Sequence, residues 1–128
     1  YKENGESLIN GLPFKLDGYP SSNGTFSANF SPSGKYLALD GWSNPPTINE
    51  PNVWIIDMQQ FLRDPSKTID PIVSINTQRD YCMFFGSDPV FITDSTFVIN
   101  MWRATGADGG YHEISIDGRY IRKLTKPY

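Results

Sequence analysis

The sequence predicts an all-β protein built from two four-stranded antiparallel meanders, and three observations lead to this prediction. Eleven glycines and ten prolines favour frequent turns over long helices. No stretch keeps a helical period beyond about eight residues, whereas short apolar and β-branched runs recur along the whole chain. The order of these runs also repeats after about 60 residues, which indicates two similar units in tandem.

The composition limits the class of protein. The 128 residues are 38% hydrophobic, 14% aromatic and 20% charged, which suits a packed core and argues against disorder. No apolar run approaches the roughly 20 residues of a membrane span. The net charge is −3, and the only dense basic stretch, at residues 119–126, alternates with apolar residues as in a strand. We therefore expect neither membrane insertion nor a nucleic-acid partner.

The first unit is expected over residues 24–80, after an N-terminal segment of residues 1–23 that holds a possible extra strand at 12–17. Pro32-Ser-Gly34 predicts a hairpin turn, because proline presets φ and glycine accepts a positive φ. Residues 57–64 can form one or two helical turns before Pro65 ends them. The strands of this unit are predicted at residues 24–31, 35–40, 52–58 and 71–76.

The second unit is expected over residues 81–128. Asp117-Gly118 between alternating runs is a strong hairpin signal, and Asp94-Ser95 predicts another tight turn. Trp102 follows the second strand of this unit, as Trp42 follows that of the first. The strands are predicted at residues 81–85, 90–93, 96–102, 111–116 and 119–125. The sequence thus predicts no more than one short helix in the whole chain.

Two motifs resemble the repeats of TolB-like, WD40-like (WD-repeat) β-propellers. They are Phe-Ser-Pro-Ser-Gly-Lys-Tyr-Leu-Ala at residues 30–38 and Ile-Asp-Gly-Arg-Tyr-Ile-Arg-Lys-Leu-Thr at residues 116–125. In that family a strand ends in an aromatic-Ser-Pro-Asp-Gly-Lys turn and the unit closes with Leu-Thr. Here Ser33 replaces the aspartate, and Thr93-Asp-Ser95 replaces Pro-Asp-Gly in the second unit. The second unit therefore departs from the family pattern at its turn.

The resemblance implies that each unit is a propeller blade. Two blades cannot close a ring, so they would stay open unless copies oligomerise or the chain is a fragment of a larger propeller. Three copies would give the six blades common in that family. The resemblance also implies a periplasmic or secreted protein. A self-contained β-sandwich made of the same strands is the alternative fold.

No catalytic or metal-binding pattern stands out. His112 has no second His or Cys at metal-ligand spacing, and no Gly-x-Ser-x-Gly motif accompanies it. We expect it to be a half-exposed strand residue. Cys82 lies in an apolar run and is expected to be a buried, inert packing residue. The sequence therefore predicts a non-enzymatic protein without cofactor or metal.

The candidate site is a binding face. In a four-stranded meander, the loops between second and third strands and the connections between units share one face, and binding residues concentrate on such loops. Trp and Arg also dominate interface energetics. The candidate binding residues are Trp42, Arg79, Asp80, Trp102, Arg103 and Asp108.

The leading hypothesis is a recognition module that binds a protein or peptide partner. A first alternative is that both tryptophans only fill gaps between blades. A second is carbohydrate binding, in which Trp42, Trp102 and Tyr111 would stack on sugar rings. A third is that the chain is the accessory propeller portion of a hydrolase or lyase.

Overall fold

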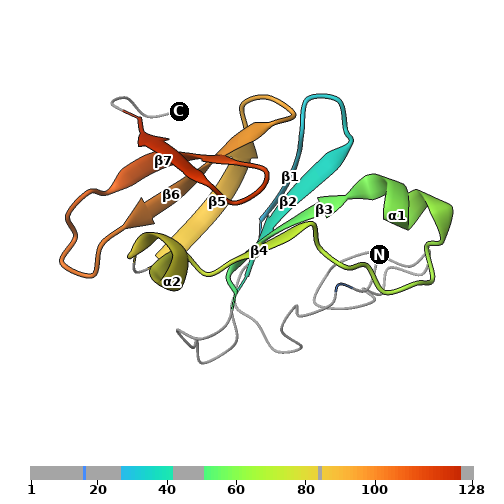
Figure 1. Ribbon diagram of the computed structural model, residues 1–128, viewed down its shortest axis with the longest axis horizontal. Coiled ribbons are helices and arrows are strands. Elements are labelled where there is room, and N and C mark those ends of the chain that lie inside the picture. The colour runs from blue at the N-terminus through green and yellow to red at the C-terminus, as the bar shows by residue number, and fades with distance from the viewer. Residues whose placement is uncertain (1–15, 17–26, 42–50, 84, 125–128) are drawn as a thin grey trace.

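The computed structural model describes residues 16, 27–41, 51–83 and 85–124, and these form two four-stranded antiparallel sheets in chain order (Figure 1). Trp42, residues 24–26 and most of segment 12–17 lie outside the described residues. Sheet 1 contains β1 (Ala28–Phe30), β2 (Tyr36–Asp40), β3 (Val53–Asp57) and β4 (Val73–Ile75). Sheet 2 contains β5 (Phe85–Phe91), β6 (Thr96–Trp102), β7 (Gly110–Ser115) and β8 (Tyr120–Lys123). The prediction of a β-rich chain with two four-stranded antiparallel sheets is confirmed.

The two sheets differ in the first turn. Phe30 pairs with Leu37 in sheet 1, whereas Phe91 pairs with Phe97 in sheet 2, so the second turn is one residue shorter. Gly34 accounts for the longer turn, because its φ of +79° is a conformation that favours glycine. The second turn instead closes with the Thr93 hydroxyl, which accepts hydrogen bonds from the amides of two following residues.

Two short helices interrupt the strands, so the prediction of at most one is wrong. The expected helix is α1 (Met58–Arg63), which begins where the Asp57 carboxylate accepts the Gln59 amide at 2.9 Å. The second, α2 (Thr77–Tyr81), lies between the sheets in the chain. The Asn76 side chain caps the start of α2 by accepting two amides. Because the helix runs to Tyr81, the strand expected to begin at residue 81 does not begin there. Of the described residues in the strands expected at 81–85 and 90–93, only Phe85, Val90 and Phe91 lie in a strand, the single bulged strand β5, which also includes the residues expected between them.

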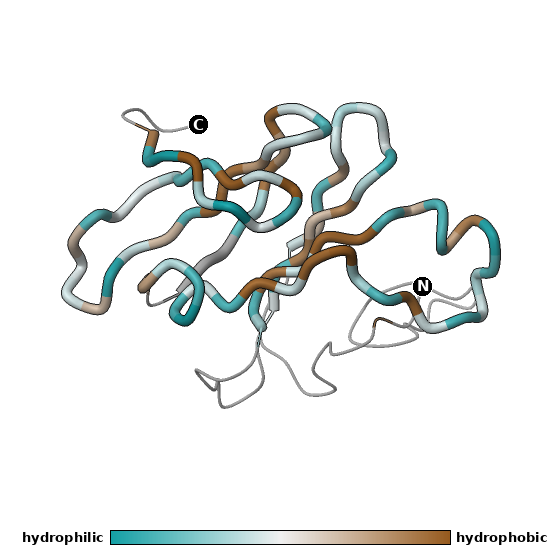
Figure 2. Tube along the Cα trace, in the orientation of Figure 1, coloured by the Kyte–Doolittle hydropathy of each residue, from teal (hydrophilic) through white to brown (hydrophobic). Residues whose placement is uncertain are grey.

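The larger core lies between the sheets, where β1, β2 and β3 contact β5. Alternation along β2 and β3 places Ala38 and Ile55 on the face toward sheet 2, where they meet Phe97 and Ile99 of β6. All four side chains are fully buried. Figure 2 shows the corresponding hydrophobic stretch along β3 in the middle of the molecule. Both sheets therefore depend on one shared core.

A smaller core covers the other face of sheet 1. Leu39, Trp54 and Ile56 point to this side and pack with Leu16 and Ile69. Leu16 makes a parallel bridge to Ile69 and is the one described residue of segment 12–17. Sheet 1 is therefore covered on both faces.

Polar contacts also join the sheets. The buried Asp40 carboxylate accepts the amide of Ser27 within its own sheet and the amide of Asp88 in β5, the latter at 2.9 Å. Asp88 occupies the bulge of β5 with a φ of 53°, so this bond fixes an unusual backbone. The Asn29 side chain adds a bond to the Pro89 carbonyl at 2.9 Å. These bonds fix how β5 sits against β1 and β2.

Candidate functional site

We call the helix α2 with Cys82 and Met83, together with the loop 103–109, the loop end. The two parts lie at the same end of sheet 2, because Phe85 at the start of β5 pairs with Trp102 at the end of β6. Met101 pairs with Gly110 and thereby closes the loop at this end. Figure 1 shows α2 and this loop on the same side of the molecule. Four of the six candidate binding residues, Arg79, Asp80, Arg103 and Asp108, lie on the loop end.

Arg79 and Asp80 form an exposed ion pair on α2. Arg79 Nε donates to Asp80 Oδ1 at 2.8 Å, and its Nη2 donates to Oδ2 at 3.2 Å. Burial acts to raise the pKa of Asp80, but the bonds from Arg79 and from the Asn76 amide outweigh it and lower that pKa. The helix is held below by Thr77, whose amide and hydroxyl both bond to the buried Asn52 side chain. A short helix is thus kept in place with its charged pair facing solvent.

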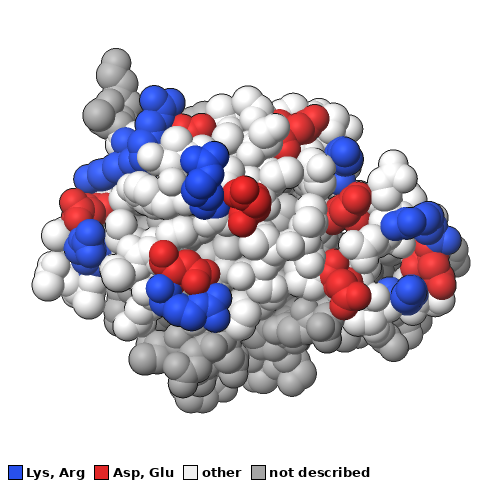
Figure 3. Space-filling view, in the orientation of Figure 1, with Lys and Arg blue, Asp and Glu red and all other residues white. Residues whose placement is uncertain are grey.

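Arg103 and Asp108 form the second ion pair, within the loop between β6 and β7. Arg103 Nε donates to Asp108 Oδ2 at 2.6 Å, and this bond lowers the pKa of Asp108 and raises that of Arg103. Figure 3 shows acidic and basic atoms side by side both over α2 and over this loop.

His112 supports the loop from below, and the expectation that it is half-exposed is wrong. His112 is 1% exposed. It pairs with Ile99 of β6, and paired residues point to the same face of a sheet, so the imidazole faces sheet 1 as Ile99 does. Nε2 lies 2.8 Å from the Asp108 carbonyl, which can only accept, so Nε2 carries the proton. Nδ1 lies 2.9 Å from the Tyr120 hydroxyl. Both ring nitrogens are therefore engaged, Nε2 with the loop and Nδ1 with β8.

Cys82 also departs from its prediction, since it is exposed rather than buried. It is the residue that ends α2, with a left-handed φ of 59°, and its amide bonds back to the Gln78 carbonyl. This turn directs the chain into β5 and leaves the thiol outside the core. The apolar neighbours of Cys82 in the sequence therefore did not determine its burial.

The tryptophans are not brought onto the loop end as a pair. Trp42 lies outside the described residues. Trp102 is half-buried and shares the outer face of sheet 2 with Asn100 and its ladder partner Tyr111. Two of the three aromatic residues of the carbohydrate hypothesis therefore lie on one sheet face, away from sheet 1.

Sequence reasoning missed a groove between β4 and the turn from β7 to β8. Its volume is about 610 Å³, and its lining combines β4 with α2 and the turn. The Tyr81 hydroxyl crosses from α2 and donates to the Gly118 carbonyl at 2.5 Å. Burial, followed by the charges of Asp80 and Asp117, raises the pKa of Tyr81, so the hydroxyl keeps its proton. No local motif could reveal this groove, because the two bonded residues are 37 positions apart. The groove is lined by Val73, Ser74, Ile75, Arg79, Asp80, Tyr81, Asp117, Gly118, Arg119 and Tyr120.

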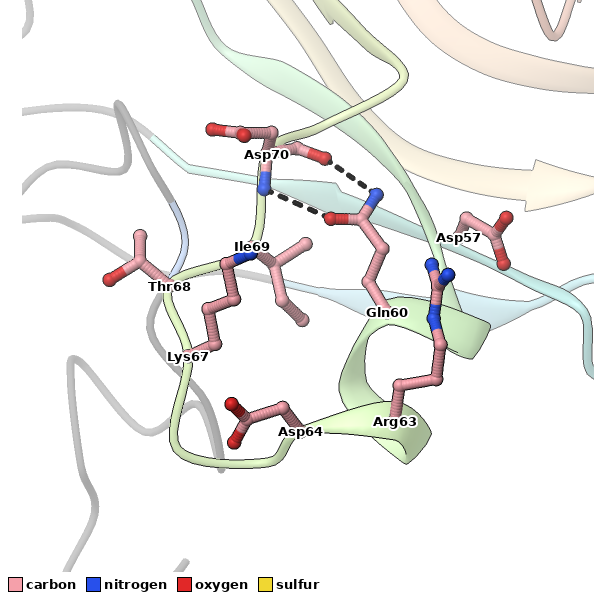
Figure 4. A pocket seen from close by; sticks show the side chains of 8 residues that line it. All are labelled: Asp57, Gln60, Arg63, Asp64, Lys67, Thr68, Ile69 and Asp70. Atoms are coloured by element: carbon pink, nitrogen blue, oxygen red, sulfur yellow. Dashed lines mark hydrogen bonds between the residues drawn. The ribbon is translucent and has the colours of Figure 1, made fainter.

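A second hollow, of about 390 Å³, lies between α1 and the loop that follows it (Figure 4). Gln60 closes one side: its side chain donates to the Asp70 carbonyl at 3.0 Å and accepts the Asp70 amide at 3.3 Å. Arg63 and Lys67 line this hollow together with the carboxylates of Asp57, Asp64 and Asp70. None of the candidate binding residues lines this hollow, which makes its cations useful controls.

Glycine at position 118 shapes the missed groove. We expect Gly118→Ala to lower the free energy of unfolding by about 1–2 kcal/mol, because residue 118 has a φ of +91° and a Cβ would lie 3.2 Å from the Val73 side chain. Gly109→Ala is the matched control, since its Cβ would meet nothing closer than 3.7 Å. Urea unfolding of both variants measures the effect, and equal losses would contradict this account of the turn.

Within the described part of the chain, no three His, Cys, Asp or Glu side chains gather closely enough to hold a metal ion. The helices of that part are also too short to cross a membrane. Comparisons with protein-family models, with curated proteins and with solved structures found no match. The function has therefore to be argued from the geometry of the loop end.

Proposed function

We propose that the two sheets are neighbouring propeller blades and that the chain is a non-catalytic recognition module, which binds a protein or peptide partner through the loop end. Support for the blades comes from two consecutive antiparallel meanders, each ordered as in the sequence and packed through one face. Support for the binding role comes from one observation, the two Arg–Asp pairs displayed together on the loop end.

These pairs contribute little to folding where they stand. The Arg79 side chain is 61% exposed and that of Arg103 is 46% exposed, and exposed ion pairs add little stability. The backbone beneath them, in contrast, is fixed by the Asn76 cap, the Asn52 contacts and the His112 bond. Rigid display of arginine and aspartate side chains lowers the entropy cost of binding and suits a partner with complementary charges.

The non-catalytic part of the proposal is supported by His112. A general base needs a free ring nitrogen within reach of a substrate proton. Here Nδ1 faces the Tyr120 hydroxyl, Nε2 faces the Asp108 carbonyl, and the ring is buried. The imidazole therefore acts as a support for the loop.

A ring around these blades would be completed either by copies of this chain or by further blades of a longer propeller. On the outer side of sheet 1, Leu16 and Ile69 already cover the face and are themselves buried, so a neighbour would lie beyond them. A neighbour on the other side would meet the outer face of sheet 2, with Trp102 and Tyr111. The two sides are thus unlike, and they require unlike surfaces on the neighbours.

The experiment is a selection of phage-displayed 12-residue peptides on the immobilised chain, followed by fluorescence polarisation with the enriched peptides. We expect Arg103→Ala to weaken their binding at least about ten-fold, the effect of an interface hot spot. Arg63→Ala and Lys67→Ala, which remove cations at the hollow of Figure 4, are the controls. The proposal fails if no peptide is enriched, or if Arg103→Ala binds like these controls.

A further inference from the structure

We propose that the groove between β4 and the β7–β8 turn binds an extended peptide segment that carries an acidic side chain. This inference rests on the proposed function in one respect, that the partner is a protein or peptide. It adds the conformation of the bound segment, its chemistry, and a place of binding beside the loop end. Arg79 and Asp80 belong to both places, whereas Arg103 belongs to the loop end alone.

The backbone of β4 forms one wall of the groove. β4 is the last strand of sheet 1, and among the described residues no strand pairs with its outer edge. An unpaired edge offers backbone donors and acceptors to an added strand, which is a common way of binding extended peptides. The opposite wall, the turn through Gly118, is tied to α2 by the Tyr81 bond and lies against the Val73 side chain of β4. An extended chain would therefore add along the outer backbone edge of β4, beside this contact.

The charges of the groove favour an acidic side chain. Asp80 is occupied by Arg79, and Asp117 accepts the Ser115 hydroxyl and the Arg119 amide. The guanidinium of Arg119 makes no hydrogen bond or ion pair within the described part of the chain, although its charge helps to lower the pKa of the neighbouring Asp117. A carboxylate from a bound segment would give this cation a bidentate partner.

Apolar surface lies on both sides of the groove. The rings of Tyr81 and Tyr120 are 5.9 Å apart, and Tyr120 is 39% exposed. On the other side, the half-buried Val73 of β4 lines the groove. Side chains of an extended chain alternate between two sides, so the residues directly before and after the acidic residue point to the other side from it. We therefore expect these two neighbours to be β-branched apolar residues.

The test uses the full chain and a fluorescein-labelled peptide, Thr-Val-Glu-Val-Thr-Val amide, in fluorescence polarisation. We expect saturable binding that weakens about ten-fold in Arg119→Ala, as for loss of a charge-assisted hydrogen bond. Lys123→Ala is the matched control, because it removes an exposed cation of β8 outside the groove, and it should leave affinity unchanged. Replacing Glu by Gln in the peptide should weaken binding to the wild type but not to Arg119→Ala. Methylating alternate peptide nitrogens should abolish binding.

Absence of saturable binding, or equal affinity of the wild type and Arg119→Ala, would overturn the groove. Arg103→Ala separates this result from the proposed function, because it should not change the affinity of this peptide. If binding of phage-selected peptides depends on Arg103 while the hexapeptide does not bind, the loop end is supported as a binding surface and the groove is rejected. If binding of the hexapeptide depends on Arg119 while no selected peptide depends on Arg103, the groove is supported and the loop end is rejected.

Discussion

Phe97→Ala should lower the free energy of unfolding by about 3–5 kcal/mol, the usual cost of removing a fully buried phenylalanine. Phe97 is 0% exposed, lies in the core between the sheets, and its ring is 5.7 Å from that of Phe91. A cavity there removes contacts from both sheets at once. Urea unfolding, followed by circular dichroism and by tryptophan fluorescence, should show one transition shifted to lower urea.

Phe30→Ala is the control for this prediction. Phe30 is also a strand phenylalanine, in β1, but it is 60% exposed, so its removal should cost little. Phe97→Leu keeps most of the apolar volume and should fall between the two, which keeps the test useful if Phe97→Ala does not fold. A loss below about 1 kcal/mol in Phe97→Ala would contradict a shared core.

Asp40→Ala should cost about 2–4 kcal/mol, because it leaves the amides of Ser27 and Asp88 without their acceptor. Asp94→Ala is the control: it removes a carboxylate that accepts one amide, from Ser33, and it should cost less. Thermal unfolding at pH 7 compares the two variants. Equal losses would mean that the Asp40 bonds do not fix β5 against sheet 1.

The pH dependence of Asp40 gives this prediction a second readout. Burial raises the pKa of Asp40 above 3.8, although its amide bonds act in the other direction. The native state therefore holds this proton more tightly than the unfolded chain, and stability is lost as pH rises from 3.8 through the raised pKa. The stability of the wild type relative to Asp40→Asn should accordingly be greatest below pH 3.8 and decrease across that window. Asp80 and Asp108, with lowered pKa values, act in the opposite sense as pH falls below 3.8.

Local turn chemistry explains why most strands could be predicted. Pro32-Ser-Gly34 and Asp117-Gly118 fix two hairpins through residues that prefer their backbone angles, and both turns are found where expected. The helix α2 was missed because five residues give no helical period, and the Asn76 cap was the only local signal for it. The apolar residues after Tyr81 suggested a strand instead.

Burial could not be read from local pattern at the site. His112 is buried because its side of β7 faces sheet 1, a fact of tertiary packing that alternation alone does not reveal. Cys82 is exposed because a left-handed residue turns the chain at that point. Arg79, Asp80, Arg103 and Asp108 lie at one end of sheet 2 because the strand order determines where these loops emerge, and their role in binding stays a prediction.

The most direct test of the loop end as the binding surface is a ¹⁵N–¹H NMR titration of the full chain with a phage-selected peptide. The account predicts that the largest shifts belong to the amides of Arg79, Asp80, Arg103 and Asp108 and to their neighbours on the loop end. Largest shifts on α1 and the loop after it, around the hollow of Figure 4, would contradict it.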